Sequence, residues 1–171
     1  MSEALWANRP RPGTEAGLPP TWTVRPATAA ELTALRVRLR ETLRDGGRPA
    51  AATDEEVEWL LLAFEELASN ALRHGRPPVQ VTLRTGADGW LLEVTDAAPD
   101  QPPAAAIGRD PSGGGLGLHL VARVASEHGW TVRGSRKQVW ARIRFTAAAT
   151  DPSVPPPRSG GSPRARTPHG S

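Results

Sequence analysis

The chain has 171 residues, which is enough for one domain of ordinary size and too few for two full domains. Lysine and arginine number 21 against 18 aspartates and glutamates, and the net charge of +3 is too small to indicate a nucleic-acid-binding protein. Cysteine is absent, which excludes disulfides and thiolate metal sites, and no secretory leader pattern or long apolar run is present. We therefore expect a cytoplasmic protein without a membrane partner.

The two ends of the chain differ in composition from its centre. Residues 1–20 contain four prolines and no periodic apolar pattern, and residues 148–171 are rich in proline, serine, glycine and arginine. Such segments lack the apolar residues that a packed core requires. The sequence therefore predicts two disordered tails around one ordered domain at 21–147.

The first half of this domain begins with a short predicted strand at 21–26. Leucines at helical spacing then predict a helix over 29–47, which ends in two glycines. A second helix is predicted from Asp54 to His74, because Thr53 and Glu56 have the spacing of a capping box and Gly75 precedes two prolines.

The second half is predicted to contain mostly strands. In chain order we expect strands 79–85 and 90–96, a Pro/Ala-rich loop 97–112, a helix that ends near His128, and strands 130–135 and 137–145. Most of these strands follow one another as hairpins. The order therefore predicts an α+β two-layer sandwich, in which helices cover one face of a mixed, mostly antiparallel sheet.

Two polar residues on the second predicted helix form a candidate site. Glu66 and Asn70 lie one turn apart, on roughly the opposite side from an apolar stripe that must face the sheet. A carboxylate and an amide one turn apart offer hard oxygen ligands to a divalent cation. The same spacing also occurs by chance on exposed helical faces, so the pair alone leaves both interpretations open.

A second candidate site combines an acidic residue and a group of glycines. Asp96 ends a predicted strand, where its carboxylate could accept a hydrogen bond from a ligand amine or simply begin a turn. The glycines from Gly113 to Gly117 lead into a helix, whose free N–H groups and dipole attract phosphate. They lack the spacing of a P-loop or of a dinucleotide-binding motif, and a flexible hinge is the alternative.

The order of these pieces resembles a known superfamily. EELASNALRHG (65–75), VTDAAPDQP (94–102) and GGGLGLHLVARVASEHG (113–129) are similar to the N, G1 and G2 boxes of the GHKL, or histidine kinase-like, ATPases. The resemblance covers about residues 21–146. Within the superfamily, the first box and the Val-Trp-Ala of the last strand are most similar to the stand-alone anti-sigma-factor serine/threonine kinases of actinobacteria.

The resemblance implies the Bergerat ATP-binding fold, with ATP and Mg²⁺ as ligands. By the same resemblance Glu66 is the general base of phosphoryl transfer, Asn70 ligates Mg²⁺, and Asp96 accepts a hydrogen bond from the adenine amine. The further nucleotide-binding residues that it implies are Gly113, Gly115, Leu116 and Gly117.

The function implied is that of a regulatory kinase that phosphorylates a small anti-sigma-factor antagonist protein. A sigma factor as a second partner and a homodimer are left open, and no direct nucleic-acid partner is expected. One alternative is a non-catalytic ATP-dependent binding module, which is favoured by a departure in the G1 box, where Ala97, Ala98 and Asp100 replace residues that are Asn and Gly in histidine kinases. The other alternative is a histidine-kinase-like ATPase domain acting in trans. No histidine precedes His74 in this chain, which argues against autophosphorylation on an upstream histidine.

Overall fold

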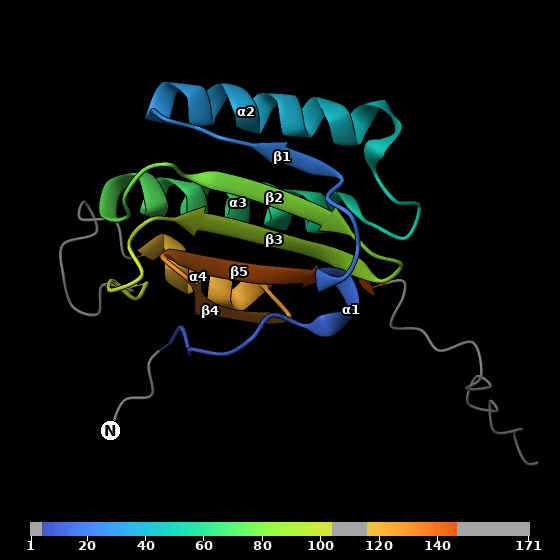
Figure 1. Ribbon diagram of the computed structural model, residues 1–171. Helices are drawn as coiled ribbons and strands as arrows, with labels where there is room; N and C mark the ends of the chain where they lie inside the picture. The colour runs from blue at the N-terminus through green and yellow to red at the C-terminus, as the bar shows by residue number, and fades with distance from the viewer. Residues whose placement is uncertain (1–4, 104–115, 147–171) are drawn as a thin grey trace, which may run out of the picture.

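The computed structural model describes residues 5–103 and 116–146 (Figure 1). Five strands form one sheet in the order β1-β2-β3-β5-β4. In chain order the elements are α1 (Gly13–Ala16), β1 (Trp22–Val24), α2 (Ala29–Thr42), the π-helical turn η1 (Leu43–Gly47), α3 (Asp54–His74), β2 (Gln80–Thr85), β3 (Gly89–Asp96), α4 (Leu116–Val124), β4 (Glu127–Arg133) and β5 (Arg136–Arg144).

Every named strand pairs antiparallel with its neighbours. The one parallel pairing among the described residues is a single bridge between Asn8 and Trp130. Helices α3 and α4 pack on one face of the sheet, and α2 packs beside α3 near the β1 edge (Figure 1). The predicted α+β sandwich with a mostly antiparallel sheet is therefore confirmed.

The core lies between the sheet and α3. Side chains alternate between the two faces of a strand, so Trp90, Leu92 and Val94 of β3 point toward the helices and are buried. On α3 the buried surface is wider than the predicted apolar stripe, because Ala63 and Leu67 are buried as well. A helix that is buried over this much of its surface requires packing partners on more than one side, and α4 supplies the second one.

Helix α3 begins and ends at the predicted residues. The Thr53 hydroxyl accepts a hydrogen bond from the Glu56 amide, and the Glu56 carboxylate accepts one from the Thr53 amide. Glu56 also accepts hydrogen bonds from the backbone amide and the hydroxyl of Thr146, just after β5. The capping box therefore both starts α3 and ties it to the end of the last strand.

One predicted helix changes its geometry before its last residue, and another ends earlier than expected. Helix α2 stops at Thr42 and continues as η1, in which Gly46 has a φ of 103°, a conformation that favours glycine. Helix α4 stops at Val124, and His128 lies in β4 rather than on that helix. The amide and hydroxyl of Ser126 both donate to the carbonyl of Arg142, so the backbone leaves the helix to pair with β5.

The segment 5–20 was expected to be disordered, but it packs along the edge of β4 and across the outer face of the sheet. Its backbone pairs with Trp130 through Ala7 and Arg9. The side chain of Trp6 is buried, and its indole N–H donates to the carbonyl of Leu118 on α4. The prediction was therefore wrong for these residues, whereas the predicted tail at 148–171 lies outside the described residues.

Ion pairs with buried charged residues attach the segment 5–20 to the outer face of the sheet. Glu93 and Arg142 lie on the outer face of β3 and β5 and are buried. Arg11 pairs with Glu93, and Glu15, which is also buried, pairs with Arg142 at 2.5 Å. A buried charge requires partners, and the N-terminal segment supplies Arg11 for Glu93 and Glu15 for Arg142, in addition to Arg84 and Asp88.

Candidate functional site

The described residues of the predicted site lie at two contacts around the second half of α3. Glu66 of α3 meets Gly117 in the first turn of α4, and Asp96 at the end of β3 meets Gly75 just after α3. Asn70 lies on α3 between these two contacts. Gly113 and Gly115 fall outside the described residues, and Leu116, the first residue of α4, is exposed.

Glu66 and Gly117 are in direct contact. A Cβ atom on Gly117 would lie 1.7 Å from Oε2 of Glu66, so the glutamate carboxylate fills the space that any other residue would need. Partial burial, and to a lesser degree the Glu65 carboxylate, raise the pKa of Glu66, while Arg73 opposes this rise. Glu66 thus has a raised pKa and contacts the first turn of a different helix, α4. These are properties of a proton acceptor beside an anion-binding position.

The neighbouring carboxylate points to a different partner. Glu65 forms an ion pair with Arg36 of α2, with 2.9 Å between Oε2 and Nε. Glu66 instead lies on the α4 side of the helix. Two adjacent glutamates thus occupy two different environments, and only Glu66 belongs to the candidate site.

Asn70 is less exposed than predicted. The sequence placed it with Glu66 away from the apolar stripe, but its side chain is only 6% exposed. Asn70 is therefore a buried residue of α3, one turn from Glu66, and does not lie on an open surface.

Asp96 is fully buried at the end of β3. Its Oδ1 accepts a hydrogen bond of 2.8 Å from the backbone amide of Ala98. A Cβ atom on Gly75 would lie 2.6 Å from Cγ and 2.7 Å from Oδ2 of Asp96, and 2.5 Å from the carbonyl oxygen of Ala71. Glycine at position 75 is therefore required for the end of α3 and the Asp96 carboxylate to approach each other.

Lys137 contacts a residue of the candidate site, and sequence reasoning missed it. It is the only lysine of the chain and lies on β5 directly opposite Asp96. Its Nζ is 3.2 Å from Oδ2 of Asp96 and donates a 2.8 Å hydrogen bond to the carbonyl of Gln101. The signal that could have found it was the only lysine of the sequence, at the start of a predicted strand.

The loop after Asp96 is fastened to the end of α3. Ala97 donates its amide to the carbonyl of Arg76, and the Arg76 guanidinium makes two hydrogen bonds to the Asp100 carboxylate, of 3.1 and 3.2 Å. The backbone amide of Asp100 and the Arg76 side chain lower the pKa of Asp100. Asp100, which departs from the G1 pattern, thus has a structural role in the loop.

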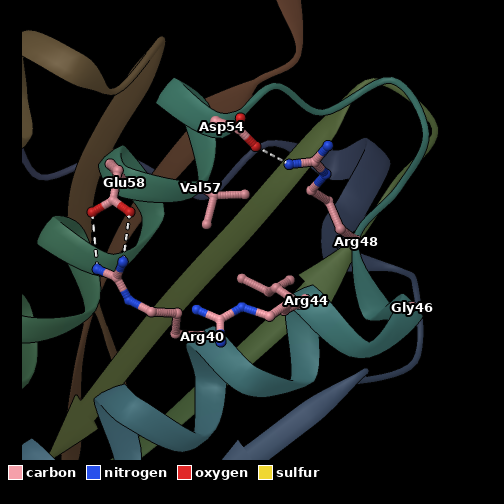
Figure 2. Close-up of a pocket in the computed structure, with 8 residues that line it drawn as sticks. Arg40, Arg44, Gly46, Arg48, Asp54, Val57 and Glu58 are labelled. Atoms are coloured by element: carbon pink, nitrogen blue, oxygen red, sulfur yellow. Dashed lines mark hydrogen bonds and ion pairs between the residues drawn. The ribbon is translucent and has the colours of Figure 1, made fainter.

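A separate cavity lies at the other end of α3 (Figure 2). It measures about 490 Å³ and is lined by Arg40, Leu43, Arg44, Gly46, Arg48, Asp54, Val57 and Glu58. Arg40 pairs with Glu58, and Arg48 pairs with Asp54. Two of its three arginines are thus paired with carboxylates. Val57 lies roughly 20 Å along α3 from Asn70, so this cavity is distinct from the candidate site.

Neither a metal cluster nor a membrane span is found among residues 5–103 and 116–146. No three histidine, aspartate or glutamate side chains gather there as a metal site would require. No helix in these ranges is long and apolar enough to cross a membrane.

The fold and the three sequence boxes together define the class of this protein. The family model described as a histidine kinase-like ATPase domain matches residues 26–143, so the chain belongs to that family. The match includes Glu66, Asn70, Asp96, Gly117 and Lys137. A search of curated proteins finds no match.

Solved structures align with this chain at low sequence identity. The structure of the RsbU and RsbW domains of Rv1364c from Mycobacterium tuberculosis aligns with a TM-score of 0.50 and 20% identity over 74% of this chain, which spans only 33% of that longer chain. The SiaB-SiaC complex from Pseudomonas aeruginosa aligns with a TM-score of 0.49 and 16% identity, over 73% of this chain and 90% of the other. The histidine kinase AdeS from Acinetobacter baumannii aligns with a TM-score of 0.41 and 16% identity, over 73% and 68% of the two chains.

Proposed function

We propose that this protein binds ATP with Mg²⁺ and transfers the γ-phosphoryl group to a serine or threonine of a small protein partner. The observation that carries the proposal is the contact between the Glu66 carboxylate and Gly117 in the first turn of α4. This contact supports the proposal, because Glu66 would act as the proton acceptor beside the helix end at which the family resemblance expects the phosphates.

The residues present fit a magnesium nucleotide. Asn70 offers an amide oxygen one turn from Glu66, and Mg²⁺ prefers such hard oxygen ligands together with substrate phosphates. When bound, the metal would neutralise charge on the phosphates. Asp96 would accept a hydrogen bond from the adenine amine, and the first turn of α4 would face the phosphates with its free N–H groups.

In the proposed transfer, Glu66 accepts the proton of the acceptor hydroxyl. The hydroxyl oxygen forms a bond to the γ-phosphorus, the bond from that phosphorus to the β–γ bridging oxygen breaks, and ADP leaves. Phosphoryl transfer depends mainly on positioning and on charge stabilisation, so one base, one metal ligand and a helix terminus form a sufficient set.

The proposed acceptor is an anti-sigma-factor antagonist protein. This choice rests on the similarity of the first box and the last strand to the stand-alone anti-sigma-factor kinases. A sigma factor as a second partner and a homodimeric state are extensions of the same resemblance.

The test of this function is a comparison of Glu66→Gln with Glu65→Gln. Each variant would be incubated with γ-labelled ATP and candidate antagonist proteins encoded nearby. Loss of the base should reduce transfer by roughly 10²–10⁴-fold in Glu66→Gln, with little change in ATP affinity measured by calorimetry. Glu65→Gln loses an exposed ion pair with Arg36 and the smaller of the two effects that raise the pKa of Glu66, so it should transfer nearly as well as the wild type.

Two outcomes would contradict the proposal at different levels. Equal loss of transfer in both variants would contradict the role of Glu66 while leaving the kinase activity intact. ATP binding by the wild type without transfer to any partner would favour a non-catalytic binding module, and transfer to a histidine would favour an ATPase domain acting in trans.

A further inference from the structure

The Asp96–Lys137 pair is buried at the position where the proposed function places the adenine base. The side chain of Asp96 is 0% exposed and that of Lys137 is 2% exposed. Buried charges of this kind are rare and cost free energy unless each has a partner. Lys137 and Asp96 partner each other, but an apolar pair of similar size would often stabilise a fold equally well, so the presence of these buried charges requires an explanation.

The pair retains hydrogen-bonding capacity on both sides. The ammonium group has three N–H donors, and within the described residues it makes one hydrogen bond, to the carbonyl of Gln101. Oδ2 of Asp96 forms an ion pair with Nζ at 3.2 Å, and it has no hydrogen-bond partner among the described residues. The buried pair thus presents an acceptor and a donor side by side.

An adenine edge has the complementary arrangement. Its exocyclic amine is a donor, and the adjacent ring nitrogen N1 is an acceptor. Because Asp96 can serve only the amine, a second group is needed to read N1, and Lys137 is the nearest charged donor to Oδ2 in the described structure.

We propose that Lys137 is a specificity-determining residue that donates a hydrogen bond to N1 of adenine while Asp96 accepts one from the amine. The inference rests on the proposed ATP-binding function and adds a second base-reading group to it. Lys137 is not part of the phosphoryl-transfer step.

The experiment compares ATP with two analogues by calorimetry in the presence of Mg²⁺. In 1-deaza-ATP a C–H group replaces N1, whereas 7-deaza-ATP alters the other side of the purine and serves as the control ligand. A hydrogen bond from a charged donor corresponds to roughly 10- to 100-fold in affinity. The wild type should therefore bind ATP about 10- to 100-fold more tightly than 1-deaza-ATP and should bind 7-deaza-ATP nearly as well as ATP.

The variant Lys137→Met should bind ATP and 1-deaza-ATP with nearly equal affinity. A merely structural lysine would instead weaken both nucleotides by the same factor on substitution. The control variant is Arg136→Met, which removes a neighbouring positive charge whose side chain contacts Pro78 and Thr95 instead, and it should keep the wild-type preference. If Lys137→Met does not fold, Lys137→Met combined with Asp96→Asn removes both buried charges and should also lack the preference.

The possible failures are distinguishable. A wild type that binds ATP and 1-deaza-ATP equally would overturn the role of Lys137 and leave the proposed function standing. A preference for ATP that survives in Lys137→Met or in the double variant would also overturn it. A wild type that binds no ATP would overturn both proposals.

Discussion

Gly75→Ala tests the close approach between the end of α3 and Asp96. The added Cβ atom would lie 2.5 Å from the carbonyl oxygen of Ala71, which itself accepts the Gly75 amide, and 2.6 Å from Cγ of Asp96. Ordinary contacts are about 3.5 Å or longer, so one side must move by roughly 1 Å. Overpacking of this kind costs about 1–3 kcal/mol, and weakening of the hydrogen bond adds about 1 kcal/mol.

The sum corresponds to a fall in melting temperature of about 4–16 °C for a chain of this size. Thermal unfolding followed by circular dichroism would measure it, and calorimetry should show weaker ATP binding because Asp96 is displaced. The matched control is Gly13→Ala, because nothing lies within 4 Å of its added Cβ atom. A Gly75→Ala protein that melts and binds ATP like the wild type would refute this explanation of the glycine.

Two further results are expected. Gly117→Ala displaces the flexible end of the Glu66 side chain rather than backbone, so the melting temperature should change little. Phosphoryl transfer, measured with γ-labelled ATP, should fall by about 100-fold because Glu66 is misplaced. Unchanged transfer would contradict the role of the contact between Glu66 and Gly117. Burial of Glu56 opposes its ionisation, but hydrogen bonds from Thr146 and Thr53 outweigh this and lower its pKa below 4.5. Its contribution to stability is therefore present above pH 4.5 and is lost as the pH falls through the lowered value, and urea unfolding at a series of pH values should show a shallower acid loss for Glu56→Gln than for the wild type.

Local patterns predicted the parts of the fold that depend on neighbouring residues. Helix α3 has the predicted bounds because its capping box and its terminal glycine act within a few residues. The end of α4 was predicted too late, because the helix ends where Ser126 donates to the carbonyl of Arg142, which is distant in the sequence. The order in residues 5–20 was missed for the same reason, since the partner of Glu15 lies 127 positions away.

The candidate site shows the same difference between features that local sequence patterns predict and features that depend on distant residues. The resemblance assigned Glu66, Asn70 and Asp96 to the candidate site, but it could not indicate that Glu66 contacts Gly117, because that contact depends on how α4 packs on α3. Lys137 was missed because its importance depends on the register of β5 against β3, which places it opposite Asp96. No local pattern in the sequence determines that register.

The most direct test of the account is a calorimetric titration of the whole chain with ATP. We expect saturable binding in the presence of Mg²⁺ that weakens when the metal is removed with a chelator. Asn70→Ala should keep the fold but lose this dependence on the metal, because the proposed metal ligand is gone. A correctly folded wild type that binds no ATP, with or without Mg²⁺, would contradict the central claim.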